Sequence, residues 1–415
     1  MAEHFDTLET RDPEIRERAQ LSALPARIAF AKTRTAAYAK ILAGVEPASI
    51  ESRAALAQLP VTRKSEFLEL QKASRPFGGF AASRWGEAPR VFASPGPIYE
   101  LDGAAPDYWR LARALFAAGF RRGDLVHNCF SYHCTPAGSM LECGAHALGC
   151  TVFAGGTGQT EQQVQAMADL GPAGYVGTPS FLKIILEKAD ELGVALPTLN
   201  KALVSGEAFL PSVRDALSAR GIAGFQAYAS ADVGSIAYES EARDGLIGDE
   251  GVILEIVRPG TGDPVAAGEV GEVIVTTLAA DAYPLIRFGT GDLSAVVPAS
   301  LGTASACGRT NVRIRGWLGR ADQTTKVKGM FVHPSQVAEI VRRHPGIVKA
   351  RLAVDHAEGA DRMTLHVEGR ENRATAEAIV ASMREVTKLR GEVVFHAPGE
   401  LANDGKVIED LRKYT

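Results

Sequence analysis

The stretch Gly174-Tyr-Val-Gly-Thr-Pro-Ser-Phe-Leu-Lys-Ile-Ile-Leu-Glu-Lys-Ala-Asp-Glu-Leu192 contains two successive hydrophobic patterns. Its first four residues form a short uncharged run, which is typical of a buried strand. The later residues carry apolar side chains at helical spacing as far as Gly193, where a helix is expected to end. The stretch therefore predicts a strand at Gly174–Gly177 and a helix at Ser180–Leu192.

The same alternation of strand and helix extends in both directions along the chain. We expect helices at Pro106–Ala118, at Thr135–Ala147, from Thr160 (with a capping box to Gln163) and at Pro211–Arg220, and strands at Leu125–Ser131, Thr151–Ala154, Ala202–Ser205 and Gly224–Ala229. Such alternation predicts an α/β fold whose sheets are mostly parallel and covered by helices.

Three further regions complete the expected organisation. Residues 12–43 read as one helical arm, and residues of about 250–300 read as an antiparallel β subdomain with strands at Val252–Val257, Glu272–Thr277 and Leu293–Val297. Beyond Asp322, two helices (Pro334–His344 and Ala374–Thr387) alternate with strands at Ala350–Asp355, Met363–Glu368 and Glu392–His396. We therefore expect a large N-terminal domain over 1–321 and a small α+β domain over 322–415.

The composition is that of a globular protein with 415 residues, too many for one ordinary core. A formal net charge of −4 gives no indication of a nucleic-acid or membrane-surface partner. The charged N-terminus has no signal-peptide pattern, and no apolar stretch approaches the ~20 residues that cross a bilayer. These features predict a cytoplasmic protein.

Four of the five cysteines lie in one segment with three histidines, namely Cys129, Cys134, Cys143 and Cys150 with His127, His133 and His146. A zinc site is one interpretation of this cluster. No C-x-x-C pair is present, however, and small buried hydrophobic residues explain the cysteines more simply. We predict no structural zinc.

Three motifs occur in a fixed order toward the C-terminus: Pro284-Leu-Ile-Arg-Phe-Gly-Thr-Gly-Asp292, Gly319-Arg-Ala-Asp322 running into Thr325-Lys-Val-Lys-Gly329, and Asp404-Gly-Lys406. This ordered set resembles the closing motifs of the adenylate-forming enzymes, which include acyl-CoA synthetases, firefly luciferase and peptide-synthetase adenylation domains. Gly156-Thr-Gly-Gln-Thr-Glu161, Thr178-Pro-Ser180, Cys307-Gly-Arg-Thr310 and Met330-Phe-Val-His-Pro-Ser335 resemble the phenylacetate-CoA ligase branch. The resemblance covers nearly the whole chain.

The resemblance implies an AMP-forming ligase that uses ATP, Mg²⁺ and CoA. Lys406 would be the catalytic lysine between the substrate carboxylate and the α-phosphate, Asp292 would accept the ribose hydroxyls, and Arg320 would pair with the ribose or phosphate. Asp322 would be the hinge about which the C-terminal domain moves. The ordinary alternatives are a surface lysine in a turn, a turn aspartate and a solvated linker aspartate. Members of the branch are usually dimeric, so a homodimer is also implied.

The resemblance places two more nucleotide contacts at the carboxyl ends of strands. The loop Ser205-Gly206-Glu207 would face adenine, although an ordinary strand-to-helix loop explains it equally well. Tyr228 would flank adenine. Asp232 stands where the family has a glutamate that helps to bind Mg²⁺, and an aspartate still suits a hard cation. Alternatively, Asp232 caps the stretch that follows it.

The phosphate loop is the largest departure from the family. The family has a glycine-rich loop with a lysine, whereas this chain has Val91-Phe-Ala-Ser-Pro-Gly-Pro-Ile98, where only Ser94 and Gly96 match. Pro95 and Pro97 each remove an N–H donor. Another group must support the leaving phosphates, or adenylation is slow, or it has been lost.

The acyl pocket is expected between the sheet and three loops, with lining candidates Tyr132, His133, Phe153, Ala229 and Ile236. Core packing explains any one of them equally well. The leading hypothesis is a ligase that activates an aromatic or arylacetic monocarboxylic acid and transfers it to CoA. The alternatives are a ligase with a carrier-protein or amine acceptor, and a nucleotide- or acyl-CoA-binding homologue that has lost the reaction.

Overall fold

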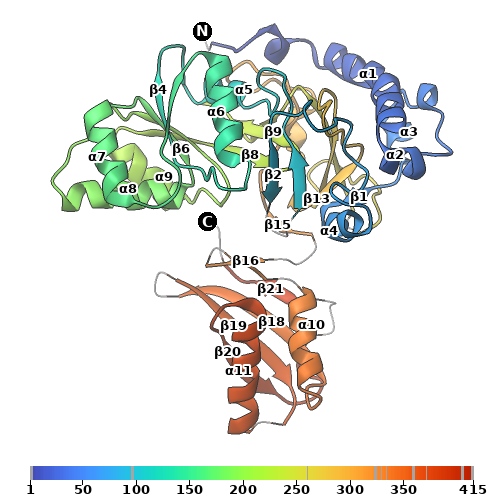
Figure 1. Cartoon of the computed structure of the whole chain (residues 1–415), viewed down its shortest axis with the longest axis vertical. Coiled ribbons are helices and arrows are strands. Elements are labelled where there is room, and N and C mark those ends of the chain that lie inside the picture. Colours follow the sequence, from blue (N-terminus) through green and yellow to red (C-terminus); the bar gives the residue numbers. More distant parts are fainter. Residues whose placement is uncertain are drawn as a thin grey trace. The chain divides into compact units, whose positions relative to one another are not determined.

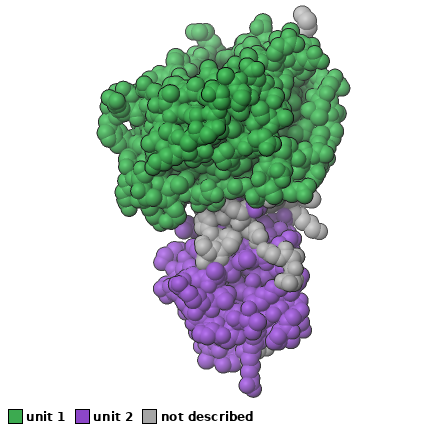
Figure 2. Space-filling view, turned by 90° about the vertical axis from the view of Figure 1, so that its right-hand side faces the viewer, with its two compact units in different colours: residues 1–319 green, residues 320–415 purple. Residues whose placement is uncertain are grey.

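The computed structural model describes residues 3–94, 98–258, 260–321, 325–328, 330–332, 334–357, 360–370, 372–402 and 406–412. The chain divides into two compact units, Met1–Gly319 and Arg320–Thr415 (Figure 2). Each unit has hydrophobic clusters of its own. The division falls at 319/320, beside the boundary at 321/322 that the motifs indicated. No described helix is both long and apolar enough to cross a membrane.

The N-terminal unit is built around a long sheet in the strand order β14-β10-β9-β8-β7-β6-β4-β5 (Figure 1). Its parallel part consists of β4 (Leu125–Asn128), β5 (Thr151–Ala154), β6 (Gly174–Gly177), β7 (Lys201–Val204) and β8 (Ala223–Ser230). The helices between these strands are α6 (Ala137–Leu148), α7 (Thr160–Leu170), α8 (Pro179–Glu191) and α9 (Pro211–Ala219), and α5 (Ala112–Ala117) precedes β4. The predicted α/β fold is confirmed.

Strand β6, in the middle of the parallel part, shows why the stretch from residue 174 to residue 192 decides this architecture. Its neighbouring residues Tyr175 and Val176 are both fully buried, yet they belong to different hydrophobic clusters. Successive side chains of a strand point to opposite faces, so both faces of the sheet are covered. Leu182 and Ile185 of α8 pack in the same cluster as Tyr175, and α7, α8 and α9 lie together beside this part of the sheet (Figure 1).

Antiparallel strands continue the sheet beyond β8. These are β9 (Gly234–Glu239), β10 (Leu246–Gly248) and β14 (Arg313–Ile314). A second sheet has the order β1-β13-β12-β11, with β11 (Val252–Val257), β12 (Gly271–Thr277) and β13 (Phe288–Ser294) antiparallel and β1 (Thr62–Arg63) parallel to β13. This sheet is the predicted antiparallel subdomain, although its last strand begins five residues before the predicted Leu293.

The N-terminal arm is two helices rather than the single predicted one. α1 spans Pro13–Arg34 and α2 spans Ala36–Ile41. Thr35 separates them because its backbone is extended and its hydroxyl accepts a hydrogen bond from the N–H of Tyr38, which caps α2. Three short helices, η1 (Thr7–Thr10), η2 (Pro47–Ser49) and α3 (Arg53–Ala57), flank the arm.

The buried carboxylate of Glu9 attaches the N-terminal segment to the rest of the unit. It accepts hydrogen bonds from Arg309 Nε at 2.8 Å and from the Tyr238 hydroxyl at 2.6 Å. Arg309 belongs to the Cys307-Gly-Arg-Thr310 motif, so this arginine holds the N-terminal segment and the motif together. A buried pair with a second donor is a strong anchor, because the loss of one partner leaves an uncompensated charge.

The predicted helix Pro106–Ala118 is wrong over its first half. Asp107 and Arg110 have left-handed backbones with φ of 51° and 60°, so the helix α5 begins only at Ala112. The Asp107 carboxylate accepts hydrogen bonds from the N–H groups of Leu111 and Ala112 at 2.9 and 3.1 Å. Asp107 therefore acts as a cap for a helix that starts later.

The remaining described elements of the N-terminal unit are α4 (Lys64–Ala73), η3 (Pro298–Ser300) and the hairpin formed by β2 (Val91–Ser94) and β3 (Ile98–Leu101). β15 (Gly319–Arg320) lies at the boundary of the units. The C-terminal unit contains a sheet in the order β20-β19-β18-β21, made of β18 (Lys349–Ala357), β19 (Ala360–Glu368), β20 (Glu392–His396) and β21 (Ile408–Asp410). It also contains α10 (Pro334–Arg343), α11 (Arg373–Thr387) and the hairpin of β16 (Thr325–Val327) and β17 (Met330–Val332), which is the predicted α+β composition.

Candidate active site

Six of the predicted N-terminal site residues follow the carboxyl ends of parallel strands. β4, β6, β7 and β8 run parallel and are neighbours in the sheet. Their carboxyl ends therefore lie along one edge, where open α/β sheets usually bind ligands. The segments that follow these strands include Tyr132, Ser205 and Asp232. The fold thus brings residues far apart in the sequence to one edge.

Asp292 is held by two aromatic donors. The Tyr228 hydroxyl donates to Asp292 Oδ2 at 2.9 Å, and Trp317 Nε1 donates to Oδ1 at 3.1 Å. The Tyr228 hydroxyl also lies 3.3 Å from Thr290 Oγ1. β8 supplies the tyrosine and β13 supplies the aspartate and the threonine. The structure therefore joins the two sheets at the predicted ribose and adenine residues, Asp292 and Tyr228.

The loop after β7 is tied to the next helix. The exposed side chain of Glu207 accepts a hydrogen bond from the N–H of Ser180 at 2.7 Å, in the first turn of α8. Gly206 has a left-handed backbone with φ of 85°, which glycine adopts without a steric cost. Ser205 begins this turn at the end of β7. The three residues thus form a fixed turn at the carboxyl edge of the parallel strands.

At the phosphate-loop position the hydroxyl of Ser94 is already engaged. Ser94 Oγ donates to Glu100 Oε1 at 2.5 Å across the β2–β3 hairpin. Ser94 pairs with Ile98 in this hairpin, so only residues 95–97 connect the two strands. Gly96, the other predicted phosphate contact, lies outside the described residues.

Asp232 is buried and pairs with Lys64, whose ammonium group donates to Asp232 Oδ2. Lys64 is the first residue of α4, and Asp232 lies in the turn between β8 and β9. Burial and the nearby charge of Asp232 raise the pKa of Glu100 to about 8, and Lys64 partly offsets this rise. A buried acid cluster with one ammonium group therefore adjoins the phosphate-loop position.

Two of the predicted pocket residues belong to a hydrogen-bonded group beside β4. Tyr132 OH accepts a hydrogen bond from Asn128 Nδ2 at 2.8 Å, and the Phe153 ring stacks on His127 with centroids 4.9 Å apart. His127 Nε2 lies 2.6 Å from Gln163 Oε1. Burial lowers the pKa of His127, so we assign the neutral ring with Nε2–H donating to Gln163.

Gln163 organises the glycine loop after β5. Its amide nitrogen donates to the carbonyl oxygens of Gly155 and Gly158 at 2.9 and 3.2 Å. The predicted capping box between Thr160 and Gln163 is therefore wrong. Gln163 is buried, and its side chain binds the loop. The N-cap position of α7 is occupied by Gln159, whose side chain forms no capping hydrogen bond. The one sequence signal for this role was the position of Gln163, two residues after the Gly156–Glu161 motif.

The other three pocket candidates differ in exposure. His133 is exposed, Ala229 is partly buried at the end of β8, and Ile236 of β9 is completely buried in the large hydrophobic cluster. For Ile236, packing in the core accounts for the side chain without a ligand. Of the clustered cysteines, Cys129 and Cys150 are buried, and the pKa of the Cys129 thiol is raised to about 12 by burial. Among the described residues, no three His, Cys, Asp or Glu side chains form a group that could hold a metal.

The predicted residues of the C-terminal unit are partly described. Lys406 is about half exposed, and its Nζ lies 3.3 Å from Glu409 Oε1. Arg320 lies in β15. Asp322, Asp404 and Gly405 lie outside the described residues.

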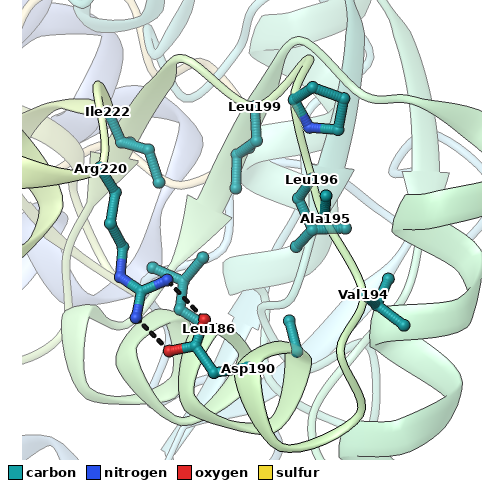
Figure 3. Close-up of a pocket in the computed structure, with 10 residues that line it drawn as sticks. Leu186, Asp190, Val194, Ala195, Leu196, Leu199, Arg220 and Ile222 are labelled. Atoms are coloured by element: carbon teal, nitrogen blue, oxygen red, sulfur yellow. Dashed lines mark hydrogen bonds and ion pairs between the residues drawn. The ribbon is translucent and has the colours of Figure 1, made fainter.

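A hollow of about 300 Å³ lies elsewhere in the N-terminal unit. Figure 3 shows apolar side chains such as Leu186 and Leu199 around it, with a forked ion pair between Arg220 and Asp190. Its lining comes from the end of α8 and from the segments that lead into β7 and β8. This is the amino end of the parallel strands, the opposite edge from the candidate site.

Comparison with known proteins decides the family. The phenylacetate-coenzyme A ligase of Thermus thermophilus is 32% identical over 378 residues, which cover 87% of this chain and 83% of that protein. The phenylacetate-coenzyme A ligase of Escherichia coli is 32% identical over 349 residues, covering 80% and 77%. The chain belongs to the phenylacetate-CoA ligase family of adenylate-forming enzymes. No family model matches it.

The fold of this family member agrees with a solved structure. A 2-hydroxyisobutyryl-CoA ligase in complex with 2-HIB-AMP and CoA superposes with a TM-score of 0.80 at 24% identity, over 98% of this chain and 92% of that one. The likeness confirms the adenylate-forming fold. The family also implies ATP and CoA as substrates. The family that the sequence motifs suggested is therefore confirmed.

Sequence reasoning missed three residues of the candidate site. Lys64 and Glu100 lie outside every motif, so only the fold could reveal that they meet Asp232 and Ser94. Trp317 lies two residues before the Gly319-Arg-Ala-Asp322 motif, and its indole reaches Asp292 from there. Its proximity to a recognised motif was the one available signal.

Proposed function

We propose that this protein is an AMP-forming ligase that activates an aromatic or arylacetic carboxylic acid with ATP and transfers the acyl group to CoA. The observation that carries the proposal is the arrangement of Tyr228 and Asp292, because it joins two predicted nucleotide contacts at the carboxyl edge of the sheet. The family at 32% identity supports the same reaction class.

In the proposed first step, a carboxylate oxygen of the acid attacks the α-phosphorus of ATP, and pyrophosphate leaves. Asp292 would accept the ribose hydroxyls, and Arg320 would pair with the ribose or the phosphate. Lys406 would place positive charge beside the carboxylate and the α-phosphate, where negative charge shifts during the reaction. Mg²⁺ would be held by Asp232 together with phosphate oxygens.

In the proposed second step, the CoA thiol attacks the acyl carbonyl carbon, the thioester forms and AMP leaves. The C-terminal unit would change position about Asp322 between the two steps. Flat acids would be accommodated beside Ala229, where the small side chain leaves space. Tyr132 and Phe153 would line the same pocket, with His133 at its mouth.

A second candidate function is binding without turnover. The phosphate-loop position favours it, because Pro95 and Pro97 offer no N–H group and the Ser94 hydroxyl is engaged by Glu100. A protein of this kind would bind AMP or an acyl-adenylate through Asp292 and Tyr228, and it would release no pyrophosphate from ATP.

The deciding experiment measures pyrophosphate release from ATP and Mg²⁺ across benzoates, arylacetates and short fatty acids, with and without CoA. We expect acid-dependent release that Lys406→Ala lowers at least about 100-fold, because the variant lacks the charge that stabilises the transition state. AMP binding and folding should be retained. Lys183→Ala is the matched control, since the side chains of Lys183 and Lys406 are 54% and 52% exposed and each lies beside a glutamate. Unchanged turnover in Lys406→Ala would contradict the mechanism.

A further inference from the structure

The β2–β3 hairpin and the turn after β8 each contribute a buried carboxylate to one charged cluster. Its two carboxylates, Glu100 and Asp232, are 1% and 5% exposed. Ser94 Oγ donates to one oxygen of Glu100, and Lys64 donates to one oxygen of Asp232. The charges of Asp232 and Lys64 both act on Glu100, so the members share one electrostatic environment.

The hydrogen bonds of this cluster are incomplete. Glu100 Oε2 and Asp232 Oδ1 are both enclosed, and neither has a hydrogen-bonding partner among the described residues. Buried polar atoms are normally paired, so two such acceptors in one cluster indicate an absent ligand. With both carboxylates ionised, a cation or a hydrogen-bond donor would satisfy these two oxygens, because ionised carboxylate oxygens only accept.

The fold fixes the direction of Glu100. The N–H group of the preceding residue, Tyr99, donates to Gln71 Oε1 at 2.8 Å, and Gln71 Nε2 donates to the Tyr99 carbonyl oxygen at 2.8 Å. This double contact attaches β3 to α4. Because side chains alternate along a strand, Tyr99 points outward with 41% exposure and Glu100 points inward. The packing of β3 on α4 therefore fixes the Glu100 carboxylate in its inward position.

We propose that Glu100 joins Asp232 in binding a hard divalent cation such as Mg²⁺, and that the Lys64 ammonium group occupies the position of this cation in its absence. A role for the cation in catalysis rests on the function proposed above, whereas its binding does not. Mg²⁺ in phosphate-handling sites typically has one or two carboxylates, and waters and substrate phosphates complete its shell. A divalent cation also balances the charge of two carboxylates, whereas a single ammonium group balances only one.

The second carboxylate compensates for the altered phosphate loop. The family loop supplies a lysine and several N–H groups, whereas this chain has two prolines and no lysine there. A metal ion held by two protein carboxylates is fixed before the nucleotide arrives. When it binds, Lys64 is displaced from Asp232 and becomes available to the phosphate oxygens.

Binding of Mn²⁺ to the full chain, followed by electron paramagnetic resonance with and without AMP, tests the proposal. We expect one Mn²⁺ per chain, displaced by Mg²⁺. Glu100→Gln should weaken binding about tenfold or more, since the amide still accepts from Ser94 but carries no charge. Glu269→Gln, the same change at an exposed glutamate of this unit, should leave binding unchanged. Equal affinity in Glu100→Gln and wild type, or no binding by wild type, would overturn the proposal.

Lys64→Met tests the place-holding role separately. Methionine keeps an unbranched apolar chain but removes the competing ammonium group, so Mn²⁺ should bind about tenfold more tightly and should raise the melting temperature more than in wild type. Unchanged or weaker binding would overturn this role. Pyrophosphate release in the same preparations reports on the ligase function independently, so a failure of either proposal is distinguishable from a failure of the other.

Discussion

At the scale of single residues, Asp107 shows how a buried carboxylate can lower stability while it caps a helix. Its oxygen accepts hydrogen bonds from two N–H groups at the start of α5. Burial nevertheless dominates and raises the pKa of Asp107 from 3.8 to about 6. The folded protein therefore binds the proton more tightly than the unfolded chain does. Between these two pH values, the free energy of unfolding falls as the pH rises.

Asp107→Asn should remove this pH dependence. A shift of about two units corresponds to about 3 kcal/mol, part of which the lost charge-assisted hydrogen bonds offset, so we expect a gain of about 1–2 kcal/mol at pH 7. Asparagine also accepts the left-handed backbone of this position. Urea unfolding at pH 4.5 and pH 7, followed by tryptophan fluorescence, measures the change. A variant that is less stable than wild type at pH 7 would show that the carboxylate's hydrogen bonds outweigh its burial.

At the same scale, the candidate site divides into residues that a sequence can and cannot reveal. Asp292 and Tyr228 lie in recognisable motifs, so their pairing was foreseeable once both motifs were assigned to one edge of the sheet. Lys64 and Glu100 are held by Asp232 and Ser94, respectively, through contacts over 168 and 6 residues of sequence. No local sequence pattern predicts either contact, because both depend on how α4 and the β2–β3 hairpin pack.

At the scale of elements, several short strands and most helix starts were predicted well, whereas the division of the N-terminal arm and the start of α5 were not. β5, β6 and β20 have the predicted bounds because each is a short run of strand-forming residues between turn signals. The start of α2 depends on the extended backbone and the capping hydroxyl of Thr35, and the start of α5 depends on the left-handed backbone and the carboxylate of Asp107. Tertiary contacts decide these backbone angles and caps, so the hydrophobic periodicity of the sequence cannot predict them.

Arg287 connects several elements of the second sheet. It is 1% exposed, forms an ion pair with Glu255 of β11 at 3.0 Å, and donates to the carbonyl oxygens of Ala57, Leu59 and Gly262 at 2.6–2.7 Å. The motif Pro284–Asp292 thus contains a structural residue beside its predicted nucleotide contact. The guanidinium group suits this role because it has five donors in a fixed plane.

Arg287→Met should lower the free energy of unfolding by about 3–5 kcal/mol, because Glu255 is left buried without a partner. Adding Glu255→Met to this variant should restore part of the loss, since no unpaired charge then remains. Urea unfolding of the two single variants and the double variant measures the coupling. Additive losses would show that the ion pair contributes little and that the carbonyl contacts of Arg287 dominate.

At the scale of the whole molecule, the two units have separate cores and separate candidate roles. The three tryptophans, Trp85, Trp109 and Trp317, all belong to the N-terminal unit. The hydrophobic cluster that contains Val327, Leu365 and Ile379 belongs to the C-terminal unit alone. Tryptophan fluorescence therefore reports unfolding of the N-terminal unit in the intact chain, and far-UV circular dichroism reports both units.

A chain that ends at Gly319 should therefore fold without the C-terminal unit. We expect it to keep the emission spectrum and the cooperative unfolding of the intact protein, because its hydrophobic clusters are contained within residues 1–319. It should also bind AMP through Tyr228 and Asp292, within about tenfold of the intact affinity, since Arg320 is lost. Pyrophosphate release should be absent because Lys406 is missing. Calorimetric titration with AMP and the pyrophosphate assay measure the two activities. A truncated chain that folds but does not bind AMP would place the nucleotide contacts in the C-terminal unit, and continued pyrophosphate release would remove Lys406 from the mechanism.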